Sequence, residues 1–249
     1  MRIAKFLAYA GVCSRRRAER YIEQGRVTLN GKVLETPAKV VSLNDRVTVD
    51  GKVIRLYSDH LPKIWMYHKP AGEIVSNHDP FHKRTIFDTS PVSERLVAVG
   101  RLDLNTEGLM LLTNFGWLAQ AYMTSSWPRQ YHARIFGPPL TESTFKSAAN
   151  GIVIRGTLYK PCKIVPKNQE RHLPKYHSNQ WVTITLTEGK NREIHRIMEF
   201  FGYKVNRLIR TNFGPFSLDD LPVQSWKRLD IVDPFFTQLP YALPKPPGL

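Results

Sequence analysis

Hydrophobic positions in the first part of the chain recur at helical spacing and then begin to alternate with polar positions. The helical spacing predicts a short helix over residues 3–10 and a second helix over residues 15–24, with Ser14 placed to cap the second one. The alternation over residues 27–53 predicts hairpins that turn at an Asn-Gly and an Asp-Gly pair. Residues 1–57 are therefore expected to form a small α+β domain.

The rest of the chain mixes both patterns. Apolar runs predict buried strands at residues 96–99, 109–112, 131–136 and 181–186. Helical spacing predicts one helix capped by Asn114 and another capped by Asn191. Residues 58–63 resemble a linker, and the prolines of residues 234–249 predict an extended or disordered tail. A larger mixed domain is expected between them, at residues 64–233.

The net charge of the chain indicates what kind of partner it binds. The chain has 36 Lys+Arg against 21 Asp+Glu, which leaves a net charge of +15. A protein this basic favours a polyanionic partner such as RNA or DNA, although a basic soluble enzyme would have the same composition. Neither of the two cysteines belongs to a Cys-x-x-Cys pair, and no signal peptide or membrane-spanning run is recognisable. A cytoplasmic protein without membrane association is expected.

The second predicted helix has more arginines than acids. Such residues usually form a solvated helix face, but here Glu19 and Glu23 are outnumbered, which favours a patch that contacts phosphates. The predicted RNA contacts are Arg15, Arg16, Arg20, Arg26 and Lys32 in this domain, together with Arg192 and Arg196 later in the chain. Residues 4–11 (AKFLAYAG), 14–16 (SRR) and 22–27 (IEQGRV) resemble the S-four RNA-binding domain. That resemblance implies RNA binding but not catalysis.

Residues 99–114 read VGRLDLNTEGLMLLTN and place Asp103 in a polar turn between two apolar strands. An aspartate in such a loop is more often a turn former than a catalytic group. The run as a whole, however, resembles the central motif of the pseudouridine synthases that act on small- and large-subunit ribosomal RNA. This resemblance extends from residue 2 to about residue 229. It implies that Asp103 is the catalytic carboxylate. Alternation of side chains along the backbone separately predicts that Arg101 lies on the same side as Asp103.

The same resemblance implies the reaction and two further site residues. The uracil base of a uridine is detached from its ribose and rejoined through a ring carbon, which requires no metal, nucleotide or redox cofactor. Residues 129–133 (RQYHA) match the motif with the active-site tyrosine, so Tyr131 is expected to stack on the target uracil, although a tyrosine that begins an apolar strand is usually core. Residues 187–196 (TEGKNREIHR) match a third motif, but His195 stands where the family has an arginine or lysine.

That departure leaves the cationic partner of Asp103 open. A histidinium at position 195 is one candidate, since a nearby carboxylate should raise its pKa, and Arg192 and Arg196 are others. His68, His78 and His82 are candidate metal ligands, but Pro80 between the last two favours loop histidines, and no metal site is expected.

The sequence thus predicts an α+β protein: a small S-four-like domain followed by a larger domain with a mostly antiparallel sheet and a cleft across it. The leading function is a monomeric pseudouridine synthase acting on ribosomal RNA or an assembling subunit, with the large subunit favoured by residues 191–194. A small-subunit enzyme and a non-catalytic ribosome-assembly factor are the alternatives. A metal-dependent nuclease would need a cluster of acids that the sequence does not show.

Overall fold

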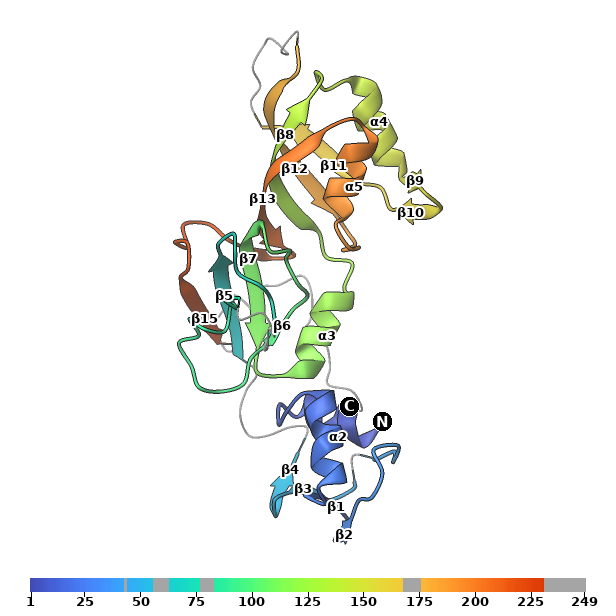
Figure 1. Ribbon diagram of the computed structural model, residues 1–249, viewed down its shortest axis with the longest axis vertical. Helices are drawn as coiled ribbons and strands as arrows, with labels where there is room; N and C mark the ends of the chain where they lie inside the picture. Colours follow the sequence, from blue (N-terminus) through green and yellow to red (C-terminus); the bar gives the residue numbers. More distant parts are fainter. Residues whose placement is uncertain (43, 56–62, 77–82, 168–175, 231–249) are drawn as a thin grey trace.

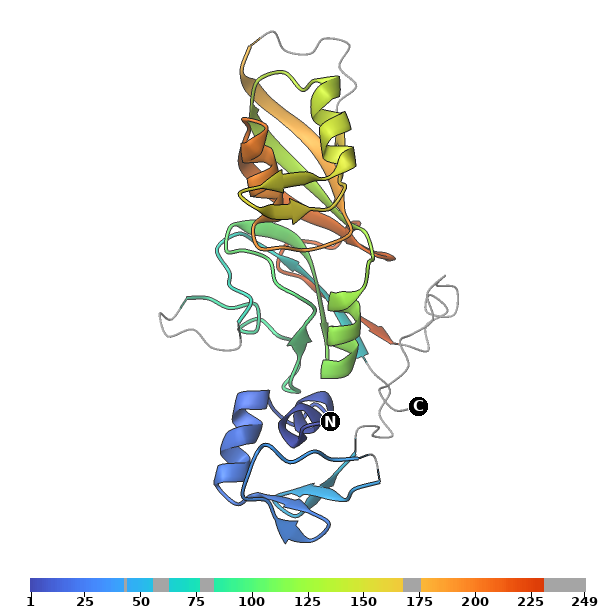
Figure 2. The ribbon, with the colours of Figure 1, turned by 90° about the vertical axis from the view of Figure 1, so that its right-hand side faces the viewer.

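The computed structural model describes residues 1–42, 44–55, 63–76, 83–167 and 176–230, and the molecule is elongated (Figures 1 and 2). The N-terminal domain lies at one end of the long axis, and the larger sheet extends from it along the molecule. The predicted tail and nearly all of the predicted linker lie outside the described residues.

The N-terminal domain contains the two predicted helices and the two predicted hairpins. Its elements are α1 Ile3–Tyr9, α2 Arg15–Glu23, β1 Val27–Leu29, β2 Lys32–Val33, β3 Val47–Val49 and β4 Lys52–Ile54. The strands form an antiparallel sheet in the order β2-β1-β3-β4. The Ser14 hydroxyl accepts a hydrogen bond from the Arg17 amide at 3.2 Å, so the predicted helix cap is confirmed.

The larger domain is built on a nine-stranded sheet in the order β11-β12-β8-β13-β7-β5-β15, with β14 paired to β13 and β6 paired to β7. Its strands are β5 Lys63–Lys69, β6 Val97–Ala98, β7 Thr106–Thr113, β8 Arg129–Gly137, β11 Lys163–Pro166, β12 Ser178–Leu186, β13 Lys204–Phe213, β14 Phe216–Ser217 and β15 Trp226–Asp230. The only parallel neighbours in this sheet, as far as it is described, are β7 and β13. The mostly antiparallel sheet is confirmed.

The helices pack on both faces of this sheet, α3 (Gly116–Thr124) on one face and α4 (Glu142–Asn150) and α5 (Glu193–Phe200) on the other. A small hairpin, β9 Ile152–Ile154 with β10 Thr157–Tyr159, follows α4. Leu109 and Leu111 of β7 pack in one cluster with α3, whereas Met110 and Leu112 pack in another with α5. Successive strand residues point to opposite faces, so α3 and α5 lie on different sides of the sheet. Near the middle of the sheet, the half covered by α3 meets the half covered by α4 and α5 (Figure 2).

Two predicted helix caps are wrong, because each asparagine side chain forms a hydrogen bond with a group other than the backbone amides at the start of its helix. Helix α3 begins after Phe115, while the Asn114 carboxamide oxygen accepts the Lys63 amide at 2.9 Å and ties β5 to the end of β7. Helix α5 begins after Arg192, and Asn191 accepts a hydrogen bond from Arg196 at 3.4 Å.

The N-terminal domain packs directly on the sheet domain. One continuous hydrophobic cluster contains Phe6 and Leu7 of α1 together with Phe115 and Leu118 beside and within α3. The two helices approach so closely that a Cβ atom at Gly116 would lie 2.8 Å from the Ala8 carbonyl oxygen. The orientation of the N-terminal domain is therefore set by packing as well as by the connecting segment.

Candidate active site

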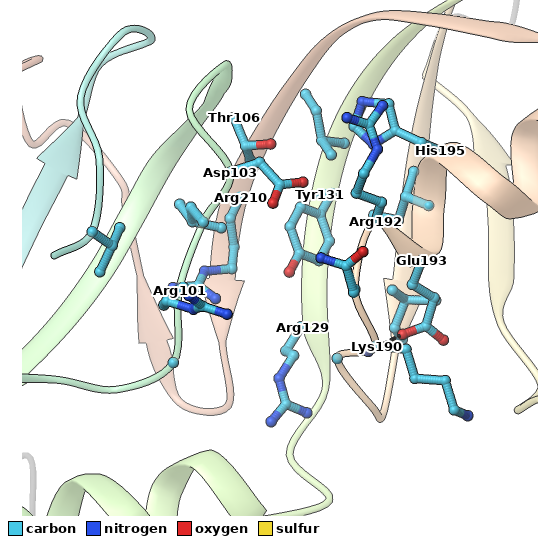
Figure 3. Close-up of a pocket in the computed structure, with 18 of the residues that line it drawn as sticks. Arg101, Asp103, Thr106, Arg129, Tyr131, Lys190, Arg192, Glu193, His195 and Arg210 are labelled. Atoms are coloured by element: carbon cyan, nitrogen blue, oxygen red, sulfur yellow. Dashed lines mark hydrogen bonds between the residues drawn. The ribbon is translucent and has the colours of Figure 1, made fainter. Parts of the chain in front are cut away.

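A cavity of about 620 Å³ opens at the middle of the sheet, where β7 and β13 run parallel (Figure 3). Residues 99–104 and the start of β7 form one wall, and residues 189–195 form the wall opposite. The beginning of β8 and part of β13 lie between these walls. Four predicted residues, Asp103, Tyr131, Arg101 and His195, come from three separate motifs, and the fold brings them all to this cavity.

Asp103 lies in the loop just before β7, and its carboxylate points into the cavity beside the Tyr131 ring (Figure 3). Its backbone carbonyl closes the turn by accepting the Thr106 amide at 3.0 Å. Among the residues that the structure describes, no hydrogen bond or ion pair engages the carboxylate itself. The side chain therefore does not brace its own loop and is free to meet a substrate.

A buried lysine supports this loop from below. Lys69 ends β5, is 0% exposed, and donates hydrogen bonds to the carbonyls of Pro70 (2.9 Å), Leu104 (3.1 Å) and Thr106 (2.8 Å). Burial lowers the pKa of Lys69 to about 8, opposed by nearby carboxylates that include Asp103. Three carbonyls converging on one ammonium hold the backbone on both sides of Asp103 in place. Sequence reasoning missed this residue.

Tyr131 is the third residue of β8, whose buried and half-buried positions alternate at its start. It is 8% exposed and lies opposite Arg210 in the register between β8 and β13. The ring forms the base of the cavity between the Asp103 loop and the wall that carries His195 (Figure 3). An aromatic face in this place can support a flat ring inserted from solvent.

His195 lies on α5 and faces the cavity from the wall opposite Asp103 (Figure 3). The expectation that its pKa would rise is wrong. Burial and the neighbouring Arg192 lower the pKa of His195, and the opposing effect of Asp103 is smaller than either. The imidazole is consequently neutral at neutral pH, and it faces the cavity as a hydrogen-bonding group without a charge.

The three predicted arginines of the site separate into two groups. Arg101 and Arg192 are exposed and line the cavity, with Arg192 held in the left-handed region at φ 49° just before α5. Arg196 lies outside it, where its guanidinium donates to the Tyr159 hydroxyl at 3.2 Å. Of the two arginines considered as replacements for the family's cation, only Arg192 reaches the cavity.

The predicted RNA contacts of the N-terminal domain are also not equivalent. Arg15, Arg16, Arg20 and Lys32 are exposed. Arg26 is held by Asp50 through a hydrogen bond of 2.8 Å and lies over the Tyr21 ring at 4.0 Å. Its charge is thus already paired, which reduces its attraction for a phosphate.

Two buried arginines, which the sequence did not assign to the catalytic site, line the cavity. Arg129 is 6% exposed and donates to backbone carbonyls, among them Met123 at 3.1 Å, while Arg210 is 3% exposed and donates to Leu109 at 2.8 Å. Both guanidiniums lie over the Phe213 ring, at 4.8 and 5.3 Å. Within the described residues neither forms an ion pair, so their charges make the cavity electropositive.

Glu193 is a buried carboxyl on the wall that carries His195. One oxygen accepts the Lys190 amide at 2.7 Å, and the other has no hydrogen-bond partner within the described residues. Burial raises the pKa of Glu193 to about 7, and the nearby Glu188 adds to the shift. Because this carboxyl is mostly protonated up to about pH 7, it adds less negative charge to the cavity than an ordinary glutamate would.

Replacing Glu193 with glutamine should stabilise the folded protein at neutral pH. Below pH 4.5, its ordinary pKa, the carboxyl is protonated in both folded and unfolded chains; between 4.5 and about 7 only the folded chain keeps the proton. The free energy of unfolding therefore falls as the pH rises across this window. Above about pH 7, Glu193→Gln should be more stable than wild type by on the order of 2 kcal/mol. Chemical denaturation at pH 5 and pH 8 measures this, with the exposed Glu199→Gln as control. Equal pH dependence in wild type and Glu193→Gln would contradict the prediction.

Within the part of the chain that the structure describes, no group of three His, Cys, Asp or Glu side chains is arranged to hold a metal ion. His68 donates from Nδ1 to the Leu221 carbonyl at 2.7 Å, and His78 and His82 lie outside the described residues. None of the described helices has the length and apolar character needed to span a membrane.

Two family models match the chain. Residues 63–200 match the model for RNA pseudouridylate synthase, and residues 1–47 match the S4 domain. This chain belongs to the RNA pseudouridylate synthase family. An uncharacterized RNA pseudouridine synthase of Rickettsia felis is 39% identical over 231 residues, which is 92% of this chain and 96% of that protein.

A ribosomal large subunit pseudouridine synthase B of Yersinia pestis is 36% identical over 238 residues, covering 92% of this chain and 73% of that protein. A crystal structure of a pseudouridylate synthase aligns with a TM-score of 0.62 at 27% identity, covering 92% of this chain and 96% of the other. The protein is therefore an RNA pseudouridine synthase with an N-terminal S4 domain.

Proposed function

We propose that this pseudouridine synthase isomerises a uridine of large-subunit ribosomal RNA, with Asp103 as the catalytic carboxylate. The observation that carries the proposal is the unpartnered Asp103 carboxylate in an electropositive cavity. The large subunit is supported by the similarity to the Yersinia pestis enzyme and by the form of residues 191–194. The enzyme is proposed to work as a monomer in the cytoplasm, where ribosomal RNA is made.

The chemistry needs an oxyanion beside the ribose of an everted nucleotide. The bond between uracil N1 and ribose C1′ breaks, the uracil turns, and a new bond forms from its C5 to C1′. C5 then loses its proton to solvent and N1 takes up a proton, so the product is an isomer of the substrate. The ribose passes through an oxocarbenium-like state, as in glycosidases. Asp103 can trap this carbon covalently or stabilise its charge, and both routes place the same carboxylate oxygens against the sugar.

The other cavity residues would hold the base and the backbone. Tyr131 is proposed to stack on the uracil, which keeps an extracted base in place while its bond is broken. Arg192 and Arg101 are proposed to contact RNA phosphates at the mouth of the cavity, and the neutral His195 to hydrogen-bond the substrate. Arg192 is then proposed to supply the positive charge that was expected at position 195, from the wall opposite Asp103 and without an ion pair to it.

The proposal is tested by following tritium released from C5 of uridine in transcripts of both ribosomal RNAs. Release from the large-subunit transcript alone supports the proposal, and release from the small-subunit transcript alone moves the target to the other subunit. RNA binding without release from either would favour a non-catalytic assembly factor. Sequencing the modified transcript then identifies the uridine.

The exposed arginines of α2 should carry much of the RNA affinity. Replacing Arg15, Arg16 and Arg20 with glutamine is expected to reduce the slope of log affinity against log salt by about 2, because each phosphate contact on single-stranded RNA contributes about 0.7. Filter binding over a salt series measures the slope. Arg26→Gln is the control, and it should change the slope less because Asp50 already pairs that charge.

These charge replacements leave the fold intact, whereas deletion of residues 1–57 would expose the hydrophobic cluster shared with α3. A salt slope unchanged by the triple replacement would show that α2 does not contact RNA.

A further inference from the structure

One face of the sheet carries basic and aromatic side chains that the site does not use. On β8, His132, Arg134 and Phe136 point to the side opposite Tyr131, because successive strand residues alternate. Trp181 of β12 lies directly opposite Arg134, which in turn lies opposite Arg207 of β13. Lys167 joins them, with its ammonium 3.2 Å from His132 Nδ1. These six residues define the open face.

The described helices pack on the other side of these strands. Helices α4 and α5 lie with Tyr131, Ala133 and Ile135 in one core cluster. Both views show α4 and α5 on the same side of β8 and β12 (Figures 1 and 2). No described element covers the open face, and the side chain of Phe136 is 41% exposed.

The positive charge of the open face favours binding of an anion. Arg134 and Arg207 are cross-strand neighbours, an arrangement in which like charges destabilise a sheet. Within the described residues, the six side chains form one ion pair, Arg207 with Glu107 at 2.7 Å. Arg134 and Lys167 are exposed and have no carboxylate partner there. A bound polyanion would turn this unfavourable pairing into a favourable one.

The aromatic residues on this face indicate which polyanion. Trp181 is half-buried in the cross-strand row between Lys167 and Arg134, while Phe136 and His132 lie diagonally from it on β8. Burial and the Lys167 ammonium lower the pKa of His132, so its ring is neutral and suited to stacking. Cations that follow a backbone, interleaved with flat rings that stack on bases, are characteristic of single-stranded RNA surfaces.

We infer that the open face binds a single-stranded segment of the same RNA whose uridine enters the cavity. This inference rests on the proposed function and adds a second contact to it. The cavity and the open face are two sides of the same strands, so RNA must pass around the sheet to reach both. The segment on the open face is therefore several nucleotides away from the isomerised uridine, and it contributes to affinity rather than to chemistry.

Two replacements on the open face test this inference against one matched control. Arg134→Gln removes an exposed charge and should lower the salt slope for the large-subunit transcript by about 0.7. Trp181→Ala should weaken binding of that transcript about tenfold by removing a stacking ring. Lys146→Gln removes an exposed charge, paired with Glu142 at 2.8 Å, from α4 on the covered side, and should bind like wild type.

Kinetics and footprinting distinguish a binding surface from damage to the site. With either open-face replacement, KM for tritium release should rise while kcat at saturating RNA stays at the wild-type value. The nuclease-protected region of the transcript should also shorten. If Arg134→Gln and Trp181→Ala both keep wild-type affinity, salt slope and footprint, the inference is overturned, and a protein becomes the expected partner of this face.

Failure of the proposed function has a different signature. In that case wild-type protein releases no tritium from any transcript, although the open-face replacements still shorten the footprint. Because Arg134 is exposed, Arg134→Gln keeps the test decisive even where loss of the Trp181 ring disturbs the fold.

Discussion

Asp103→Asn is expected to abolish tritium release while the affinity for the transcript stays close to that of wild type. The amide occupies the same volume but can neither trap the ribose carbon nor stabilise its positive charge. Loss of a nucleophile or of the group that stabilises charge costs on the order of 10⁴-fold or more in turnover. Single-turnover release with enzyme in excess measures the effect, and filter binding measures the affinity.

The control for this prediction is Asp219→Asn, which removes the same charge from an exposed turn far along the chain. It should leave release and binding unchanged, since asparagine accepts the left-handed backbone found there. Wild-type release by Asp103→Asn would refute the catalytic role of the aspartate. Loss of both release and binding would instead show that the replacement damages the cavity.

Gly108→Ala is expected to give the largest loss of stability among single-methyl additions. Gly108 has φ +105°, and a Cβ atom there would lie 2.2 Å from the carbonyl oxygen of Arg210 on the neighbouring strand. To relieve this overlap, β7 and β13 must separate where they pair in parallel, next to the Asp103 loop. We expect a loss of about 3–5 kcal/mol, from backbone strain and overpacking together.

Gly51→Ala is the matched control, because Gly51 also has positive φ but nothing lies within 4 Å of its Cβ position. It should lose only about 1 kcal/mol, the cost of the left-handed backbone. Chemical denaturation of the two variants compares them directly. Equal losses would show that β7 and β13 can move apart cheaply and that the close approach at Gly108 is not a constraint.

The motifs identified by sequence are the parts of the site that local chemistry dictates. Asp103 in its polar turn, and Tyr131 at the start of an apolar strand, both face the cavity as expected. Each depends on its own turn or on strand alternation, which a short stretch of sequence specifies. The cap by Ser14 was predictable for the same reason, because a hydroxyl reaches the amides of its own helix.

The caps at Asn114 and Asn191 were mispredicted because other groups take those side chains: a backbone amide of another strand at Asn114, and the Arg196 guanidinium of the following helix at Asn191. Asn114 binds the Lys63 amide, 51 positions earlier in the chain. The pKa of His195 falls for a related reason, because α5 places this side chain in a partly desolvated wall beside Arg192. The sequence motif does not reveal how far its residues are buried in the folded protein.

Sequence alone therefore determined the two-domain α+β organisation, the family and the residues whose roles follow from their immediate neighbours. Tertiary structure decided how those residues are supported and charged: Lys69 beneath the Asp103 loop, Arg129 and Arg210 lining the cavity, and Arg192 rather than Arg196 at its wall. The physical reason is range. Turn and strand patterns act over a few residues, whereas burial and electrostatic coupling depend on segments that meet only after the chain has folded.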